Sequence, residues 1–473
     1  MSAASKPRPG YPSPGYRVPA TRLTFYGGIN EIGGNKFLLE EGRARVFLDF
    51  GKNFGREKLY FDEPWIRPQK EEHLLALGIL PNLSGIYKKD AKAERMLDAV
   101  LLTHPHTDHY DAIRWLRDDI PSYATATTNA VILAREYSGR TGPSKEYYIG
   151  NWTKDAGKEA YRTLETIDPG RARDIAGFST SAFAVDHSVL GSVGYVVETI
   201  AGNVAYTGDF RLHGARAAQS RAFLEKAKDR EPVALLIEGT HVGESKIESE
   251  DEVQQKLTTV VQQTKGLVLA GFAPADVDRL NTFHKVAKAT DRTLIVTAKQ
   301  AFLLDQLNEK GLFDEFDLTS KNVRIFRKEK KTTSEFEKHL EEKHGGQILD
   351  AADVKALQPE AILVASLTDM LALPTIDPVA GSVYILSSSE PFNEEMEISF
   401  EKLMSWLTRY GLPLFQVHAS GHATAHDLRT AVETIRPKKV YLVHTENPAL
   451  YARFLGKLGF ETVQPVEGQP YDL

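Results

Sequence analysis

The densest group of side chains that could bind metal is the segment THPHTDH, which runs from Thr103 to His109. It places the imidazoles of His104, His106 and His109 and the carboxylate of Asp108 within six residues. Imidazole and carboxylate are the remaining ligands for a divalent transition metal, because the chain has no cysteine. A single histidine is more often a packing or surface residue, but packing alone rarely produces such a cluster. The segment therefore predicts a metal centre.

Two more candidate ligands lie at the ends of predicted strands. His187 occurs in AVDHS and Asp209 in YTGDF, and each follows an apolar run. Neither residue would be informative alone, but together with the histidine cluster they complete a site. Asp209 is suited to bridge two ions, because a carboxylate has two oxygens and can hold ions about 3.5–4 Å apart.

The elements that position these residues are short strands separated by turns. The strand-like runs of the first half are LTFYGG, NKFLLEEG, ARVFLDFG, AVLLTH, SAFAVDHS, VGYVVET, GNVAYTGDF and ALLIEGT. Several deliver a polar residue at the carboxyl end, such as Asp49 after the third run and His104 after the fourth. The segment YDAIRWLRDDI has helical spacing, so the histidine loop lies between a buried strand and a helix. The pattern predicts a layered α/β domain.

From about Leu212 to Glu395 the pattern changes to alternating strands and helices. The runs are GLVLAGF, DVDRLNTFHKVAKA, RTLIVT, AILVAS and VYILSSS. Such alternation predicts a mostly parallel sheet with covering helices. We therefore expect an inserted domain at residues 212–395, between a first part at 21–211 and a closing part at 396–473. For the charged stretch RKEKKTTSEFEKHLEEKHGG we expect an exposed amphipathic helix, with a contact surface for phosphates as the alternative.

Composition limits the class of protein. The chain has 473 residues, 42% hydrophobic and 26% charged, which is ordinary for a globular protein of two domains or of one domain with a large insert. The first twenty residues are rich in Pro, Gly and Ser and predict a flexible tail. No signal peptide or apolar span of roughly 20 residues is evident, so we expect a cytoplasmic protein with no membrane partner. The formal net charge of −6 argues weakly against nucleic acid, although a local basic channel is compatible with it.

The ordered motifs resemble those of the metallo-β-lactamase superfamily. Asp49, the HxHxDH cluster, His187 and Asp209 occur in the order of that superfamily. The closing segment HASGHATAHDLRTAVETIRPKKVYLVHTE resembles the β-CASP subgroup and especially ribonuclease J, and its two motif histidines are His422 and His444. The segments VYILSSSEPFNEEM and GFAPADVDRL also resemble the β-CASP domain of ribonuclease J. The resemblance implies an αββα sandwich with an inserted β-CASP-like α/β domain.

The resemblance also implies a ligand set for two ions, most readily Zn²⁺, with Mn²⁺ as the alternative. It assigns His104, His106 and His187 to one ion, Asp108, His109 and His444 to the other, and Asp209 to both. Asp49 would orient a ligand from behind, and Asp108 would steer the attacking water. His422 would stabilise or protonate an oxygen of the scissile phosphate, with a helix-capping or buried histidine as the alternative. Glu238, in LIEGT, is a further catalytic candidate, in a motif closer to that of the polyadenylation-type endonucleases.

A second group could supply hydroxyls and backbone N–H groups to a substrate phosphate, with an ordinary serine-rich turn as the alternative. Its members are Ser387, Ser388, Ser389, His418, Ser420 and Gly421. The chain departs from the usual ribonuclease J pattern at HPHTDHYDA and at Thr445, which reshapes the cleft wall without removing a ligand. The segment near residues 54–90 is another departure, and the sequence gives no role for it.

Three functions compete. The resemblance favours a metal-dependent ribonuclease that removes nucleotides from a 5′ end, with internal cutting as an open second mode, RNA as partner and a homodimer as one assembly to test. The second is a DNA nuclease of the same subgroup, in whose terminal motif an apolar residue usually stands in place of His444. The third is a metallo-hydrolase of a small molecule, or a binding module without activity, because a shared fold does not fix the substrate.

Overall fold

The computed structural model describes residues 20–62, 66–139, 149, 162, 164–243, 248–388 and 394–473, and for residues 394–397 only the backbone. The predicted flexible tail lies outside the described residues, except for Ala20. No helix of the described chain is long and apolar enough to cross a membrane.

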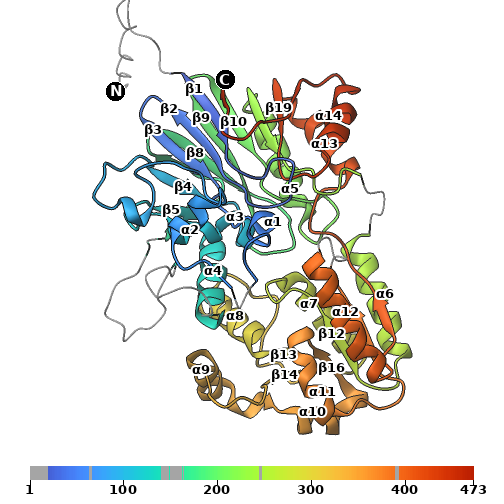
Figure 1. Ribbon diagram of the computed structural model, residues 1–473. Coiled ribbons are helices and arrows are strands. Elements are labelled where there is room, and N and C mark those ends of the chain that lie inside the picture. Colours follow the sequence, from blue (N-terminus) through green and yellow to red (C-terminus); the bar gives the residue numbers. More distant parts are fainter. Residues whose placement is uncertain are drawn as a thin grey trace, which may run out of the picture.

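Two mixed sheets pack face to face in the upper half of the view (Figure 1). The first has the order β21-β1-β2-β3-β4-β5-β6, made of β21 (Pro470–Asp472), β1 (Thr21–Phe25), β2 (Phe37–Glu41), β3 (Ala44–Leu48), β4 (Ala99–Leu101), β5 (Ser122–Ala124) and β6 (Leu164–Thr166). The second has the order β20-β19-β11-β10-β9-β8-β7, made of β20 (Thr462–Val463), β19 (Lys439–Leu442), β11 (Ala234–Ile237), β10 (Gly202–Tyr206), β9 (Val193–Thr199), β8 (Phe178–Ala184) and β7 (Ala172–Ile175). Alternate side chains of both sheets, such as Phe25, Phe37 and Tyr195, form the core between them.

Helices cover the outer face of each sheet. Against the first sheet lie α2 (Glu71–Ala76), α3 (Thr107–Tyr110), α4 (Ala126–Gly139) and the short 3₁₀ helix η2 (Asp111–Trp115). The short helices α1 (Phe54–Glu57) and η1 (Lys88–Asp90) belong to the connection between β3 and β4. Against the second lie α5 (Ala217–Lys228), α13 (Ala425–Ile435) and α14 (Pro448–Gly456). The result is the expected αββα sandwich. The departing segment near residues 54–90 contributes Leu74, Ile79 and Tyr87 to the core under the first sheet, so part of it is structural.

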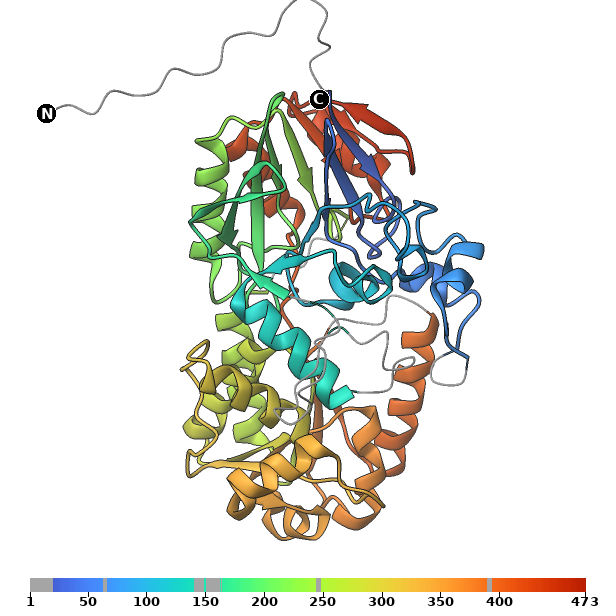
Figure 2. The same cartoon turned by 90° about the vertical axis from the view of Figure 1, so that its left-hand side faces the viewer.

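A third sheet, entirely parallel, forms the lower half of the view (Figures 1 and 2). Its order is β15-β14-β13-β16-β12-β17-β18, made of β15 (Ile348–Leu349), β14 (Val323–Phe326), β13 (Thr293–Thr297), β16 (Ala361–Val364), β12 (Val268–Gly271), β17 (Val383–Leu386) and β18 (Leu414–Gln416). One face packs on α6 (Glu250–Gln263), α7 (Val277–Ala289), α8 (Ala298–Glu309) and α9 (Glu335–His344). The other packs on α10 (Ala351–Leu357), η7 (Leu367–Ala372), α11 (Leu373–Ile376) and α12 (Glu394–Arg409). The charged stretch thus forms α9, with η5 (Gly345–Gln347) after it and η6 (Gln358–Glu360) before β16.

The limits predicted for the inserted domain need correction. β11, which follows residue 212, pairs with β10 and β19 of the second sheet. β18, which follows residue 395, pairs with β17 of the third sheet. Apolar runs such as ALLI are alike in any buried parallel sheet, so the sequence alone did not separate them. We propose that the inserted domain spans residues 250–416 and that the sandwich is built from the chain on either side.

Helix α4 joins the two parts. Its Ala130, Val131 and Ala134 pack in the core of the third sheet, whereas Ile132 packs under the first sheet. The ring of Tyr137 stacks on that of Phe302 in α8, with centroids 5.5 Å apart. Because both cores share this helix, the inserted part is held directly beside the sandwich.

Candidate metal centre

The predicted ligands meet at one end of the sandwich, where loops leave the strands of both sheets. The loop after β4 carries the histidine cluster, and His187, Asp209 and His444 follow β8, β10 and β19. Three of these positions follow neighbouring or nearby strands of the second sheet, so the fold brings together residues up to 340 positions apart in the sequence. All of the imidazoles concerned are buried except that of His106, which is half-buried.

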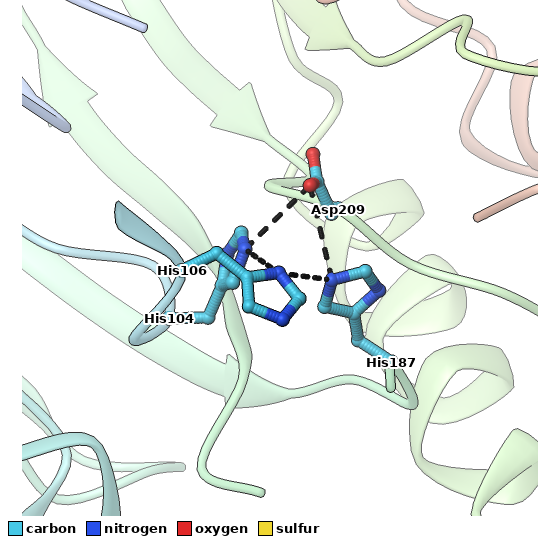
Figure 3. A group of neighbouring side chains, drawn as sticks. All are labelled: His104, His106, His187 and Asp209. Atoms are coloured by element: carbon cyan, nitrogen blue, oxygen red, sulfur yellow. Dashed lines mark hydrogen bonds and ion pairs between the residues drawn. The ribbon is translucent and has the colours of Figure 1, made fainter. Parts of the chain in front are cut away.

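One group of ligand atoms comes from four residues, His104, His106, His187 and Asp209 (Figure 3). His106 Nδ1 lies 3.1 Å from His104 Nε2 and 3.0 Å from His187 Nε2. Asp209 Oδ2 lies 3.5 Å from His104 Nε2 and 3.8 Å from His187 Nε2. Four nitrogen and oxygen atoms at these separations surround a point that a single small cation could occupy.

A second group lies on the other side of Asp209. His109 Nε2 is 3.1 Å from Asp209 Oδ2 and 3.6 Å from Asp108 Oδ2. His444 Nε2 is 3.2 Å from Asp108 Oδ2. The seven predicted ligands therefore lie in two neighbouring groups, and the assignment of each group to one ion stays a prediction. A further group that could hold a metal ion joins Asp209 and His444 to Glu238 and His422.

The hydrogen bonds behind the imidazoles fit metal ligands. The Nδ1 atom of His104 lies 2.9 Å from the hydroxyl of Thr103, and that of His109 lies 2.8 Å from Asp49 Oδ2. The Nδ1 atom of His187 lies 2.5 Å from the carbonyl oxygen of Gly421, and that of His444 lies 2.8 Å from the hydroxyl of Thr240. A proton on each Nδ1 satisfies these acceptors and leaves a lone pair on each Nε2, directed at the ligand groups. In addition, Asp209 Oδ1 is buried without a hydrogen-bond partner among the described residues. The donor set therefore fits two divalent cations.

Asp49 is fully buried behind the second group, as expected for a residue that orients a ligand. Its Oδ2 accepts hydrogen bonds from His109 Nδ1, from the hydroxyl of Thr103 (2.8 Å) and from that of Tyr206 (2.7 Å). Its Oδ1 accepts one from the backbone N–H of Thr103 (2.7 Å). The same carboxylate thus anchors the start of the histidine loop and one ligand ring.

The backbone at the site is unusual at three positions. Asp49 and His444 have φ of 57° and 49°, a left-handed conformation that few non-glycine residues adopt. At Gly51 an added Cβ would lie 1.6 Å from the carbonyl oxygen of Asp108, so only glycine lets the two loops approach. These features fix the ligand loops tightly against each other.

The imidazoles of the site differ in pKa, which is lowered in the first ligand group and raised at His109 in the second. Burial lowers the pKa of His104 and His187 well below the usual value and that of His106 to about 4, so these rings are neutral, as a metal ligand must be. Burial also disfavours the charged form of His109, but the carboxylates of Asp209, Asp108 and Asp49 raise its pKa well above the usual range. This excess of carboxylate favours a positive charge in the second group, and a divalent cation would supply it in place of a proton.

His422 lies beside the ligand groups and shares two of their neighbours, Asp209 and Thr240. Its Nδ1 is 2.9 Å from Glu238 Oε2, 3.3 Å from the hydroxyl of Thr240 and 3.7 Å from Asp209 Oδ2. Glu238 is almost fully buried and also accepts the backbone N–H of Phe210 (2.9 Å). The His422 side chain is 21% exposed, so part of the ring remains accessible.

The group predicted to hold a substrate phosphate is divided. Ser387 is buried. Its hydroxyl donates a hydrogen bond to the carbonyl oxygen of Val417 (2.5 Å) and accepts one from Arg279 Nη1. Ser388 is half-buried, and Ser389 lies outside the described residues. Burial lowers the pKa of His418 to about 3, and its Nδ1 has no hydrogen-bond partner within the described chain.

The remaining two members bond within the protein. The hydroxyl of Ser420 accepts the backbone N–H of His422 (3.1 Å), and the Gly421 carbonyl holds His187. Phosphate binding by this group stays a prediction, with Ser388 and His418 as its best-placed side chains.

Two contributors were missed by the sequence analysis. Thr240 holds His444 and lies two residues after Glu238, so the LIEGT motif could have suggested it. Asn35 Nδ2 lies 3.0 Å from His109 Nε2, and nothing in its surroundings in the sequence distinguishes it from a turn residue. Both are ordinary polar residues whose role depends on distant partners.

A buried ionic network connects the centre with the inserted part. Arg211 Nε lies 3.1 Å from Asp186 Oδ1, next to the ligand His187, and Arg211 Nη1 lies 2.9 Å from Glu250 Oε1. Arg279 in α7 donates to both Glu250 oxygens, at 2.9 and 3.0 Å. The two guanidinium groups are each about 1% exposed. Two buried guanidinium groups are thus paired with buried carboxylates across the junction of the two parts.

Comparison with known proteins gives two family matches. Residues 86–247 match the beta-lactamase superfamily domain, and residues 414–463 match the Zn-dependent metallo-hydrolase RNA specificity domain. The second match contains both His422 and His444. Together the two matches confirm the predicted superfamily resemblance, its β-CASP character and the fold class.

Curated relatives carry the name ribonuclease J. The protein from Mycoplasma pneumoniae is 22% identical over 90% of this chain and 68% of its own length. That from Mycolicibacterium smegmatis is 26% identical over 94% and 71%, and ribonuclease J 2 from Streptococcus pyogenes 22% identical over 93% and 72%. A crystal structure of a protein of unknown function from Enterococcus faecalis V583 covers 96% of this chain with all of its own, at a TM-score of 0.75 and 22% identity. That likeness supports the fold.

Proposed function

We propose that this chain, a metallo-β-lactamase-fold hydrolase of the β-CASP subgroup, is a metal-dependent ribonuclease that hydrolyses RNA phosphodiester bonds. The observation that carries the proposal is the contribution of the RNA-specificity segment to the centre. That segment supplies His444 to the second ligand group and places His422 beside it. The names of the relatives support the same activity.

The residues of the chain have separable tasks in this proposal. The ligand set His104, His106, Asp108, His109, His187, Asp209 and His444 would hold two divalent ions, Zn²⁺ or Mn²⁺. Two such ions supply Lewis acidity, which activates water and neutralises charge on phosphoryl oxygens. Asp108 Oδ2, in the more exposed ligand side chain of the second group, is placed to orient an attacking water. Asp49 keeps the His109 ring in position.

His422 acts on the substrate rather than on the ions. Glu238 accepts the Nδ1 proton of His422, which leaves the other ring nitrogen to face a substrate from the partly exposed side. A proton at Nε2 can be donated to the leaving oxygen or to a phosphoryl oxygen. Glu238 fixes the ring orientation and is itself held by a backbone N–H, so it positions His422 without touching RNA.

The proposal includes removal of nucleotides from a 5′ end, with internal cutting as a second mode. The test is to incubate metal-replete protein with RNA and DNA of the same sequence, labelled at either end, and to follow product lengths. We expect RNA to be consumed from its 5′ end and DNA to resist at the same enzyme concentration. Asp209→Asn protein purified in parallel controls for a contaminating nuclease. Faster cleavage of DNA would support the DNA nuclease, and cleavage of neither would support a small-molecule hydrolase.

A further inference from the structure

A pocket of about 340 Å³ lies at the carboxyl ends of four neighbouring strands of the third sheet and includes no residue of the metal centre. Phe326 and Thr297 are the last residues of β14 and β13, Val364 is the last of β16, and Phe272 follows β12; all line the pocket. These strands are adjacent in the order β14-β13-β16-β12. Open parallel sheets bind ligands at this edge.

The pocket also lies at a reversal in the chain topology. From β13 the chain continues through α8 to β14, on one face of the sheet, whereas from β16 it continues through η7 and α11 to β17, on the other face. The loops after β13 and β16 therefore diverge and leave a crevice between them. Thr297 to Gln300 and Val364 to Asp369 supply the two walls. Such switch points are the usual ligand sites of doubly wound sheets.

Three lysines line this crevice. Lys328 Nζ lies 2.6 Å from Asp369 Oδ1, and Lys330 Nζ lies 2.6 Å from Glu337 Oε1, so both have an acidic partner. Lys299 has none within salt-bridge distance in the described chain. Burial and the neighbouring ammonium groups of Lys328 and Lys330 lower its pKa, and the carboxylate of Asp369, already paired with Lys328, offsets this only in part.

A second, independent feature of the pocket is an unsatisfied donor. Gln300 lines it, is 1% exposed, and uses its Oε1 to accept the backbone N–H of Thr297 (3.1 Å) in the capping box of α8. That bond fixes the amide, and its Nε2 has no hydrogen-bond partner within the described chain. Buried donors without a partner are rare, so an acceptor from outside the chain is expected there. The same end of α8 has a positive dipole, although the backbone N–H of Gln300 already donates to the hydroxyl of Thr297.

We propose that this pocket is a second anion site, which binds the phosphate group of a nucleotide. Lys299, Gln300 Nε2 and the first turn of α8 converge on an acceptor with several oxygens. The hydroxyl of Ser366 lines the opposite wall, and Phe336 provides an apolar surface large enough for a base or sugar. The volume is that of a small-molecule pocket. The site needs no contribution from the metal centre and stands independently of the proposed ribonuclease activity.

The nucleotide has two possible sources, a free mononucleotide or one residue of an RNA chain. A second hollow, of about 320 Å³, shares Lys299, Lys330 and Phe336 with the pocket and reaches the end of α4 at Gly139. On the same helix, Arg135 Nη1 donates to the carbonyl oxygen of Pro105 in the histidine loop (2.9 Å). A polynucleotide could follow this basic path, so both sources must be tested.

The test uses the full-length, metal-loaded protein and reads each lysine separately. Lysines are acetylated with limiting acetic anhydride, and the modified fraction at each is measured by mass spectrometry. The probes are inorganic phosphate, AMP and non-cleavable 2′-O-methyl oligonucleotides of increasing length, against chloride at equal ionic strength. We expect Lys299 to be protected and Lys338, exposed and paired with Glu335, to be unaffected. Protection by AMP identifies a free nucleotide as the source, and protection only by oligonucleotides identifies an RNA residue.

Two variants test the geometry. Gln300→Glu keeps the oxygen that caps α8 and puts a carboxylate oxygen in place of Nε2, so the fold should survive while the anion is repelled. Lys299→Ala removes the unpaired cation. Each is expected to weaken binding of the protecting probe at least about tenfold, because a charge-assisted hydrogen bond is lost, with Lys338→Ala as the matched control. Unchanged binding in both folded variants, or absence of protection at Lys299 by every probe, overturns the proposal.

Discussion

The replacement Asp49→Asn tests how the second ligand group is built. Asparagine has nearly the shape of aspartate and tolerates the left-handed backbone at this position (φ 57°), so the loop should keep its path. The carboxylate accepts four hydrogen bonds, three at Oδ2 and one at Oδ1. An amide has one oxygen, so if it serves His109, Thr103 and Tyr206, its NH₂ must face the N–H of Thr103.

One buried donor without an acceptor costs about 1–3 kcal/mol of folding stability. In addition, the His109 ring loses an anionic partner, and losses of this kind weaken metal affinity by about 10–100-fold. We expect the ion bound by His109 to be affected more than the ion bound by His104, whose Nδ1 faces Thr103 instead. The measurements are competitive titration of each ion with a coloured chelator, and urea unfolding of the metal-free protein.

Asp119→Asn, on an exposed aspartate paired with Arg117, is the control and should leave both quantities unchanged. If Asp49→Asn binds both ions as tightly as the wild type, Asp49 does not hold His109 in the way the hydrogen bonds suggest. A protein that loses both ions equally would mean that the whole loop, and not one ring, depends on this carboxylate.

Four further predictions follow from the same geometry. His422→Ala should lower single-turnover RNA cleavage by about 10²–10⁴-fold while metal content and RNA affinity at fixed salt stay near wild type; loss of one ion would make His422 a ligand instead. Asp209→Ala should reduce metal content, measured by elemental analysis, more than His444→Ala, since Asp209 faces both ligand groups; equal content in the wild type and Asp209→Ala would contradict bridging. Gly51→Ala should destabilise the protein by at least about 1–3 kcal/mol in urea unfolding, because its Cβ would overlap a backbone carbonyl; an unchanged midpoint would refute that close approach. Burial raises the pKa of Asp276 to about 7, so the folded protein holds a proton that the unfolded chain releases near pH 4. The free energy of unfolding should therefore fall as pH rises from about 4 to 7. Asp276→Asn, which preserves the cap of α7, should flatten this dependence, and an identical pH profile would disprove the raised pKa.

The sequence was most informative where ligands are close together or follow strands. The histidine cluster is local, and His187 and Asp209 each follow an apolar run, so residue type and position sufficed to place them in one site. Thr240 and Asn35 could not be found in this way, because their roles depend on rings 204 and 74 residues away in the chain.

The third sheet shows the corresponding limit for the fold. Alternating runs predicted a parallel α/β unit, but sheet membership of β11 and β18 is decided by pairing partners, which hydrophobic pattern does not encode. Ser387 is a similar case. Its position at a strand end suggested a free hydroxyl, yet Arg279, 108 residues earlier in the sequence, occupies it.

The buried network of Asp186, Arg211, Glu250 and Arg279 limits how the inserted part can be exchanged between proteins. Removing one member of a buried ion pair typically costs about 3–5 kcal/mol, because the partner charge stays uncompensated. A chimera that received the insert without Glu250 would bury two guanidinium groups together, next to the residue that precedes His187. A swap of this insert would therefore need Asp186 and Arg211 in the recipient sandwich.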